Sequence, residues 1–251
     1  MIREVCRIIS NDKVAESIYK MVIESKIISK MAMPGQFLHI KAGESYDPLL
    51  RRPISICDLD LDKSWITLLY RVCGKGTRLF ANAKPNDFID ILGPLGKGFP
   101  TFENKRAAII GGGIGIAPLL YLSKRLKSSD IYLGFRDEAY MIEDFMKYSD
   151  NIWIYTEDGS RGNKGYPIEA LERNICNYDL VYVCGPKIML RAVKKLCEKN
   201  HIECYISMEE RMGCGIGACL VCACESSSNE EYKKVCTDGP VFNSKEVNLD
   251  D

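Results

Sequence analysis

The stretch AAIIGGGIGIAPLL, residues 107–120, places an apolar run of strand type directly before a glycine-rich loop and a second apolar run. Such a sequence points backbone N–H groups and a helix N-terminus at the end of the strand, where a pyrophosphate can bind. We therefore expect Gly112, Gly113 and Gly115 to contact a nucleotide. Because Ile116 stands where the G-x-G-x-x-G fingerprint has its third glycine, a strand-to-helix turn without a ligand fits this segment equally well.

The alternation of strand, loop and helix continues beyond this loop and predicts a parallel α/β sheet over residues 103–205. Further strands are expected at residues 131–135, 152–156 and 180–185, and a helix at residues 187–199. A second glycine turn, at Cys184 and Gly185, ends one of these strands at the same edge of the sheet. Ligands of such folds bind at that edge, so both residues are expected to bind the nucleotide.

Two acidic residues, Asp137 and Glu138, follow the second predicted strand. A carboxylate there can bind ribose hydroxyls and repel a 2′-phosphate, which favours NAD over NADP. Arg136 precedes them and carries the opposite charge. NAD is therefore the expected nucleotide, although the neighbouring arginine weakens the argument.

Residues 1–102 follow a different pattern, in which short β-rich runs alternate with turn residues. The spacing predicts an antiparallel β-barrel, with strands within residues 17–24, 35–42, 51–59, 64–72 and 87–96. A helix is expected to begin at Thr77, whose hydroxyl can cap the first turn. The predicted fold class is thus a β barrel plus α/β, followed by a small C-terminal unit over residues 206–251.

The barrel carries a second candidate site for a dinucleotide. Its members lie on one predicted strand and at the start of the helix: Arg52, Pro53, Ile54, Ser55, Gly76 and Thr77. A guanidinium, a hydroxyl and a helix N-terminus are all groups that bind phosphates. Each charged residue taken singly fits a solvated surface position just as well, so the prediction depends on their coincidence with a nucleotide fold.

The C-terminal unit contains MGCGIGACLVCAC (residues 212–224) and later KKVCTDGP (residues 233–240). The spacing C-x4-C-x2-C followed by a distant cysteine is that of plant-type 2Fe-2S ferredoxins. We predict that a cluster is held by Cys214, Cys219, Cys222 and Cys236. The glycines between these cysteines allow backbone N–H groups to approach the sulfur atoms.

Two alternatives bear on this ligand set. Cys224 also follows Cys222, but by only two residues, whereas Cys236 returns after a loop, as a ligand that closes a cluster would. A zinc site usually pairs two C-x2-C motifs or adds histidines. The histidines, His39 and His201, both lie outside this segment. We therefore favour iron-sulfur over zinc, and Cys236 over Cys224.

Composition excludes several functional classes. Lys plus Arg number 34 and Asp plus Glu number 34, so the net charge gives no reason to expect nucleic acid or a membrane surface as partner. The first residues, MIREVCRIIS, lack the apolar core of a secretory signal, which predicts a cytoplasmic protein. Its 12 cysteines are then expected to stay reduced, and those outside the C-terminal unit to be mostly small buried side chains.

Several motifs together resemble one family. They are RRPISI, LLYRVCGKGT, GGGIGIAPL, YVCGPKIM, MEERMGCGIGACLVCAC and CTDGPVF. These are similar to signatures of the electron-transfer subunits of type B dihydroorotate dehydrogenases, within the ferredoxin-NADP reductase superfamily. The resemblance covers essentially the whole chain and implies that FAD contacts residues 52–55, Leu69, Tyr70, Arg71, Gly76 and Thr77. Because Ile54 replaces the aromatic that often stacks on the flavin, Tyr70 is the candidate for stacking, with a core position as the alternative.

The resemblance also implies a function. The chain would carry electrons from the FMN of a dihydroorotate-oxidising catalytic subunit through a 2Fe-2S cluster and FAD to NAD, in UMP biosynthesis. The two subunits would form a heterotetramer with two copies of each. No side chain has to act as nucleophile or general acid, so no catalytic residue is predicted.

Other proteins share this layout. The alternative is an FAD and 2Fe-2S subunit of a hydrogenase, a sulfide dehydrogenase or a ferredoxin-linked transhydrogenase. An alternative of another class is a redox sensor or a zinc-stabilised binding module without turnover, which visible absorbance of the purified protein would distinguish.

Overall fold

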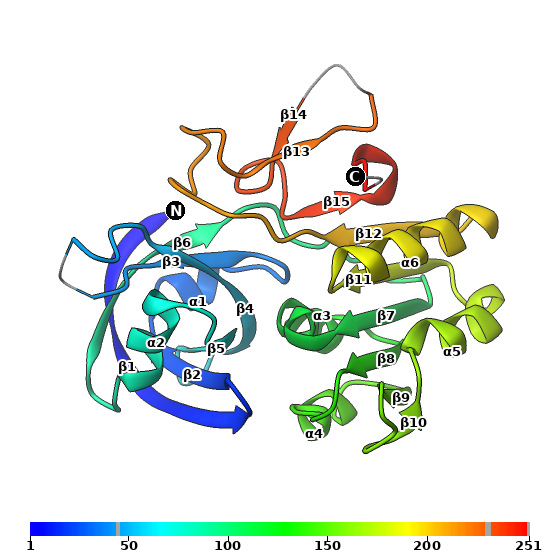
Figure 1. Cartoon of the computed structure of the whole chain (residues 1–251), viewed down its shortest axis with the longest axis horizontal. Helices are drawn as coiled ribbons and strands as arrows, with labels where there is room; N and C mark the ends of the chain where they lie inside the picture. The colour runs from blue at the N-terminus through cyan, green and yellow to red at the C-terminus, as the bar shows by residue number, and fades with distance from the viewer. Residues whose placement is uncertain (44–45, 229–231, 250–251) are drawn as a thin grey trace.

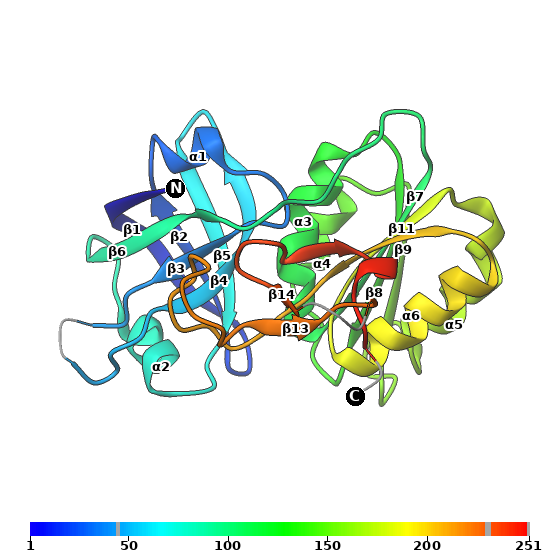
Figure 2. The ribbon, with the colours of Figure 1, turned by 90° about the horizontal axis from the view of Figure 1, so that it is seen from above.

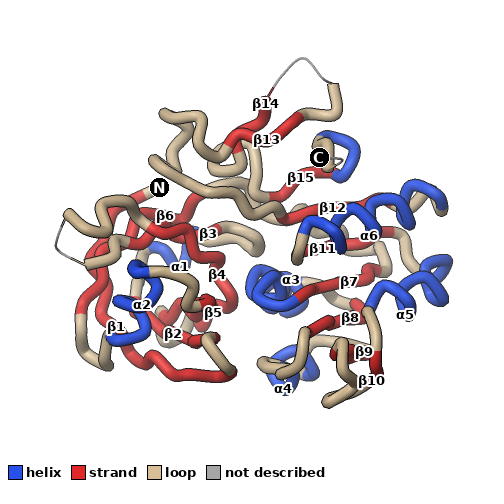
Figure 3. Tube along the Cα trace, in the orientation of Figure 1, coloured by secondary structure: helices blue, strands red, loops and turns tan. Residues whose placement is uncertain are grey.

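The computed structural model describes residues 1–43, 46–228 and 232–249. A β-barrel lies beside a sheet flanked by helices, and the C-terminal segment runs across both (Figures 1 and 2). Figure 3 shows that strands dominate the first part, whereas helices and strands alternate in the second. Among the described residues, no helix is long and apolar enough to span a membrane.

Antiparallel strands close the barrel in the order β1-β2-β5-β4-β3-β6. The elements are β1 (Ile2–Ala15), β2 (Ile18–Glu24), α1 (Ile28–Met31), β3 (Phe37–Ile40), β4 (Arg52–Asp60), β5 (Trp65–Arg71), α2 (Lys75–Asn82) and β6 (Phe88–Leu95). The predicted strands correspond to β2 through β6. Strand β1 has no counterpart among them, because charged residues interrupt its sequence and only a few of its side chains, such as Cys6 and Ile8, are fully buried.

Helix α2 begins at Lys75, before the predicted start at Thr77. The Thr77 hydroxyl lies within the first turn and accepts hydrogen bonds from the N–H groups of Cys73 (3.0 Å) and Gly74 (3.2 Å). The Thr77 hydroxyl therefore does cap the helix, as predicted, but the helix does not begin at Thr77. The hydroxyl reaches back to the residues before the helix instead of preceding it.

The second sheet has the strand order β10-β9-β8-β7-β11-β12-β15 and is parallel from β10 to β12. Its strands are β7 (Ala107–Gly112), β8 (Ser129–Phe135), β9 (Asn151–Thr156), β10 (Asn163–Lys164), β11 (Leu180–Cys184), β12 (Glu203–Ser207) and β15 (Val241–Asn243). The predicted strands at residues 107–110, 131–135, 152–156 and 180–185 correspond to β7, β8, β9 and β11.

Helices cover both faces of this sheet (Figure 1). They are α3 (Ala117–Arg125), α4 (Ile142–Met146), α5 (Pro167–Asn174) and α6 (Lys187–Lys199). Helix α3 lies between the sheet and the barrel, where it packs against β4, and α6 spans the residues predicted for it. Helix α5 was not among the predictions, because its buried stripe consists of little more than Ala170 and Leu171 beside a proline.

The C-terminal segment shares this sheet. Strand β15 pairs antiparallel with β12, and the Met208 N–H donates a hydrogen bond to the Pro240 carbonyl (2.9 Å) just beyond the pair. Between them, β13 (Ala223–Glu225) and β14 (Tyr232–Lys234) form a small hairpin. Cys222 and Cys236 join the core formed by Leu190 and Val193 of α6. The segment therefore uses the core of its neighbour, and we propose residues 206–251 as a unit of function.

Candidate functional site

A cavity of about 370 Å³, here called the barrel cavity, lies between the barrel and the C-terminal segment. Its barrel wall contains most of the residues predicted to bind FAD: Arg52, Pro53, Ile54, Ser55, Leu69, Tyr70, Arg71 and Thr77. Its opposite wall contains Met208, Glu209 and Met212. The cavity thus brings the predicted dinucleotide motif against the residues that precede the cysteines.

Gly76 does not line this cavity but shapes it. A Cβ atom at this position would come within 2.7 Å of the Arg52 Nε atom, so the guanidinium of Arg52 lies against the first turn of α2. The structure therefore places a cation and a helix N-terminus side by side, as binding of a pyrophosphate requires.

Tyr70 lines the cavity while most of its ring is part of the barrel core. Its hydroxyl donates a hydrogen bond to the Asn11 Oδ1 atom (2.9 Å), and its ring stacks on Tyr19 with the centroids 5.8 Å apart. The ring also meets Phe80 edge to face. These contacts fix the orientation of Tyr70 and match the core alternative for this residue, while an edge remains at the cavity wall.

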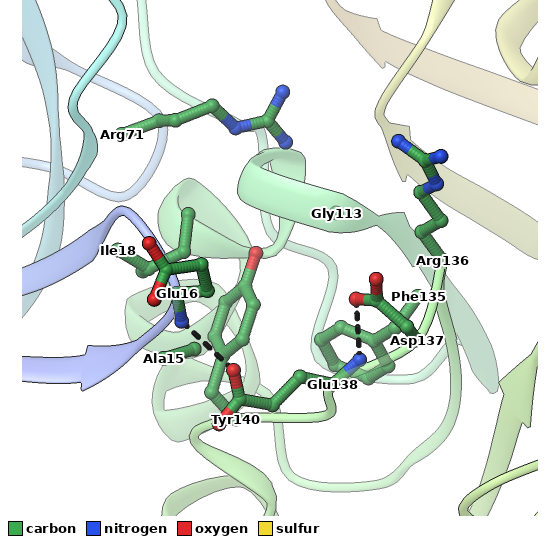
Figure 4. Close-up of a pocket in the computed structure, with 10 residues that line it drawn as sticks. All are labelled: Ala15, Glu16, Ile18, Arg71, Gly113, Phe135, Arg136, Asp137, Glu138 and Tyr140. Atoms are coloured by element: carbon green, nitrogen blue, oxygen red, sulfur yellow. Dashed lines mark hydrogen bonds between the residues drawn. The ribbon is translucent and has the colours of Figure 1, made fainter.

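A second cavity of about 260 Å³, here called the sheet cavity, lies between the turn that joins β1 to β2 and the ends of β7 and β8 (Figure 4). Gly113, Arg136, Asp137 and Glu138 line it. Arg71 lines both cavities, and Figure 4 shows its side chain above Gly113. The two candidate nucleotide sites therefore meet at one guanidinium.

The acidic residues of the sheet cavity are held by backbone groups. The Asp137 Oδ1 atom accepts a hydrogen bond from the Glu138 N–H (2.7 Å), and the Glu138 Oε2 atom accepts one from the Glu16 N–H (2.8 Å; Figure 4). Tyr140 also lines this cavity, and burial raises the pKa of its hydroxyl to about 12. The cavity is thus lined by carboxylates held in place by backbone groups and by two cations, Arg71 and Arg136.

The two predicted glycine loops touch each other. A Cβ atom at Gly115 would lie 2.7 Å from the Cys184 carbonyl oxygen and from the Gly185 backbone, and one at Gly112 would lie 3.0 Å from the Pro186 ring. The Cys184 thiol itself is buried, and burial raises its pKa. Its contribution to a nucleotide site would therefore come from its backbone.

The cysteine loop (residues 212–224) directs backbone N–H groups at sulfur. The Cys214 Sγ atom accepts hydrogen bonds from the N–H groups of Ile216 (3.5 Å) and Cys219 (3.3 Å), and the Cys236 Sγ atom accepts one from Gly217 (3.2 Å). These donors, the Ile216 N–H first, lower the pKa of Cys214 to about 6. The loop therefore stabilises negative charge on the Cys214 sulfur, whereas burial and the neighbouring Cys222 raise the pKa of Cys236 to about 11 despite the Gly217 donor.

The predicted ligands come together as two pairs. The Sγ atoms of Cys214 and Cys219 lie 3.3 Å apart, and the thiols of Cys222 and Cys236 interact with each other. In the described part of the chain, no group of three or more His, Cys, Asp or Glu side chains is arranged to hold a single metal ion. Two thiols on each side match a cluster with two irons better than a mononuclear site.

Cys224 lies apart from this arrangement. It is in strand β13, where it pairs with Lys233 of β14, and burial raises its pKa to about 11. Cys236 is buried too, and burial raises its pKa to about 11 as well, but its thiol interacts with that of Cys222, so Cys236 stays the predicted fourth ligand.

Comparison with known proteins identifies the family of this chain. It is 43% identical over 254 residues to the dihydroorotate dehydrogenase B (NAD(+)), electron transfer subunit, of Bacillus cereus (strain Q1), covering 96% of this chain and 97% of the relative. The subunit of the same name from Bacillus anthracis (strain CDC 684 / NRRL 3495) matches with the same identity and coverage. The iron-sulfur cluster binding domain of dihydroorotate dehydrogenase B matches residues 209–248. The chain belongs to the family of dihydroorotate dehydrogenase B electron transfer subunits.

Solved structures share the fold of this electron transfer subunit. The NADH-dependent reduced ferredoxin-NADP oxidoreductase, described for flavin-based electron bifurcation, superposes with a TM-score of 0.88 at 29% identity, covering 98% of this chain and 91% of that one. A ferredoxin-NADP+ reductase from Plasmodium falciparum gives a TM-score of 0.63 at 17% identity, over 78% and 91% of the two chains, and shares the fold alone.

The structure of this family member gives a place to residues that the sequence analysis quoted only as part of the motif MEERMGCGIGACLVCAC, without a role. Met208, Glu209 and Met212 form the second wall of the barrel cavity. Protein around the Glu209 carboxyl raises its pKa, and the charge of Arg71 opposes that change. In the sequence, only their position just before the cysteine loop sets these residues apart. Their role as a cavity wall follows only when β12 lies beside the barrel.

Proposed function

We propose that this chain is the electron-transferring half of an NAD-dependent dihydroorotate dehydrogenase. It would connect an FMN-containing partner, which oxidises dihydroorotate to orotate, to NAD+, by means of bound FAD and a 2Fe-2S cluster. The supporting observation is the barrel cavity, in which the predicted FAD motif faces Met212, two positions from Cys214. A flavin site and a cluster site are thereby joined through a single wall of protein.

The residues of the barrel cavity fit FAD. Arg52 and the N-terminus of α2 would hold the pyrophosphate, and Thr77 keeps that N-terminus in shape through its hydrogen bonds to Cys73 and Gly74. Apolar side chains such as Ile54 and Leu69 would exclude water from the ring system. Bound FAD exchanges electrons both singly and in pairs, which is the chemistry needed between a one-electron cluster and a nicotinamide.

The cysteine loop fits a 2Fe-2S cluster. Cys214 and Cys219 would hold one iron, and Cys222 and Cys236 the other, because the thiols already lie in these pairs. The N–H groups of Ile216, Cys219 and Gly217 would offset the charge on sulfur.

The sheet cavity is the proposed site for NAD(H). Asp137 and Glu138 would disfavour the 2′-phosphate of NADP, because both carboxylates are held near the cavity by backbone N–H groups. We expect the ratio of kcat/KM for NAD+ over NADP+ to fall when Asp137 is replaced by Asn. Steady-state kinetics of the assembled enzyme with each nucleotide would measure it, and an unchanged ratio would remove Asp137 from the site.

The proposed assembly is a cytoplasmic heterotetramer with two copies of each subunit. Anaerobic purification of the tagged chain from its native host should recover a subunit that contains FMN, and native mass spectrometry should give the stoichiometry. The complex should reduce NAD+ when dihydroorotate is added. A complex without FMN, or one that gives no NADH with dihydroorotate, would contradict the proposal.

A second candidate has one observation in its favour. The fold matches the NADH-dependent reduced ferredoxin-NADP oxidoreductase at a TM-score of 0.88. A chain of that kind would co-purify with a ferredoxin-linked subunit and would take electrons from reduced ferredoxin instead of from dihydroorotate. Assaying the recovered complex with both electron donors separates the two candidates.

A further inference from the structure

His39 is a buried histidine in the middle of β3. Its register places it opposite Pro53 of β4, within the predicted FAD motif, and opposite Leu92 of β6. The residue is 1% exposed. An imidazole in the wall of a barrel is costly to bury unless its nitrogen atoms have partners.

The other side of this imidazole contacts the cysteine loop. A Cβ atom at Gly215 would lie 2.5 Å from the His39 Nδ1 atom, and Gly215 has a φ of +71°. Only a glycine therefore fits at this position, both for its backbone conformation and for its close approach to the ring. The backbone of Cys214 also lies close enough to influence His39.

The hydrogen-bonding capacity of His39 is unused. Neither its Nδ1 nor its Nε2 atom has a hydrogen-bond partner among the described residues. The backbones of Arg51 and Cys214 lie near the ring and are the candidate acceptors for a ring N–H. The Arg51 guanidinium donates to the His39 carbonyl oxygen (3.1 Å) and is paired with Asp90, so it does not serve the ring.

We propose that His39 is a positioning residue for the cluster: with the cluster bound, its ring N–H donates a hydrogen bond to the Cys214 carbonyl and holds the cysteine loop against the FAD-binding strand. This inference rests on the cluster site of the proposed function. An N–H dipole directed at the loop stabilises the more negative, reduced form of the cluster. One side chain would thus fix both the potential of the cluster and its placement relative to Pro53 and the barrel cavity.

The test uses the holoprotein and three variants. His39→Phe keeps a ring but has no N–H, His39→Gln keeps an N–H donor, and His201→Asn is the matched control. His201 is the second of 2 histidines, is exposed, and has a positive φ that asparagine tolerates. Iron and FAD per chain, the EPR spectrum of the reduced cluster and its midpoint potential would be measured for each.

We expect His39→Phe to bind FAD and to show an altered EPR spectrum. Loss of the N–H should shift the one-electron equilibrium of the cluster about tenfold toward the oxidised form, which corresponds to about 59 mV. His39→Gln should recover most of this shift, and His201→Asn should match the wild type. A His39→Phe protein with the wild-type spectrum and potential would overturn the inference.

A cluster that is lost from both His39 variants leaves a decisive measurement on the wild type. With ¹⁵N-labelled histidine, pulsed EPR of the reduced cluster should detect a weakly coupled nitrogen that is retained in His201→Asn. The absence of any coupling would refute the role of His39, as would a coupling strong enough to make it an iron ligand. A wild-type protein without any 2Fe-2S signal would instead contradict the proposed function.

Discussion

Cys214 of the cysteine loop and Cys6 of the barrel core are the same residue type in opposite environments. In the loop, backbone N–H groups lower the pKa of Cys214 to about 6. In the barrel core, burial raises the pKa of Cys6 to about 12, with the charge of Glu4 adding to it. The difference teaches that several backbone donors favour the thiolate at Cys214, whereas burial outweighs the single donor at Cys236, whose pKa rises to about 11.

The exposure of the neighbouring apolar side chains also differs between the core cysteines and the cysteine loop. Cys57 is 1% exposed among apolar side chains of the core on the α3 face of the sheet. Around the cysteine loop, Ile216, Leu220 and Val221 are 46%, 71% and 55% exposed. Around Cys214 the loop therefore presents backbone N–H groups to sulfur and leaves apolar side chains exposed, whereas Cys57 is surrounded by apolar side chains.

The largest expected effect comes from removing one ligand while keeping its neighbour. Cys236→Ser should reduce bound iron nearly to zero, because Cys236 accepts the Gly217 N–H and pairs with Cys222. Cys224→Ser should keep the cluster, since Cys224 lies in β13. Iron per chain and visible absorbance would be compared after anaerobic purification. The reverse outcome would mean that Cys224 is the fourth ligand.

A second test compares buried and exposed thiols of the loaded protein with a maleimide. A pKa raised from 9.0 to about 12 leaves the Cys6 thiol protonated throughout the range of pH 7 to 9. Its thiolate fraction is then about a thousandfold below that of an unperturbed thiol. Cys176, which is exposed, should be labelled rapidly. Mass spectrometry of the labelled peptides checks this, and equal labelling of both residues would show that burial does not protect Cys6.

A third test strains the loop without touching a ligand. Gly217 has a φ of +82°, and a Cβ atom there would lie 2.9 Å from the Thr237 Cγ2 atom. Gly217→Ala should cost about 2–3 kcal/mol in the loaded protein and speed the loss of iron to a chelator.

Combining Gly217→Ala with Thr237→Ser tests the cause. The double variant removes the Cγ2 contact but leaves the backbone strain, so we expect it to recover part of the loss. Complete recovery would assign the effect to the contact alone, and no recovery would assign it to the backbone.

The smallest effect is expected in the core. Cys57→Ser places a hydroxyl without a partner among apolar side chains and should lower the free energy of unfolding by about 1–2 kcal/mol. Cys57→Ala should cost less, because it leaves no unsatisfied polar group. Urea denaturation would measure both, with bound iron as the control. A loss of iron in either variant would break the distinction between the two groups of cysteines.

Much of this architecture could be predicted because local patterns decide it. The glycine loop after β7, the periodicity of α6 and the cysteine spacing are each contained in a short stretch of sequence. Strand β1 could not be predicted in that way. It is defined by long-range pairing with β2 and β6, and its own sequence, with Asn11, Asp12 and Lys13, reads as a polar loop.

The site shows the same division. The motif around Arg52 and the four cysteines could be found in the sequence, since each group carries its own chemistry. Met208 and Glu209 lie in a quoted motif, but their role as a wall could not be predicted, because they face the barrel only after more than a hundred intervening residues have folded. The contact of His39 with Gly215 was missed for the same reason.

Strand β15 returns beside β12, so the polypeptide leaves the sheet and re-enters it at the same edge, with Met208 hydrogen-bonded to Pro240 where the two ends meet. The residues between them contribute Cys222, Val235 and Cys236 to the core beneath α6, so this segment is also tied to the sheet by packing. Such a junction allows the exposed part of the metal-binding loop to vary, provided that the side chains buried against α6 are kept. The fold thus separates the part that can change during evolution or engineering from the part that must stay constant.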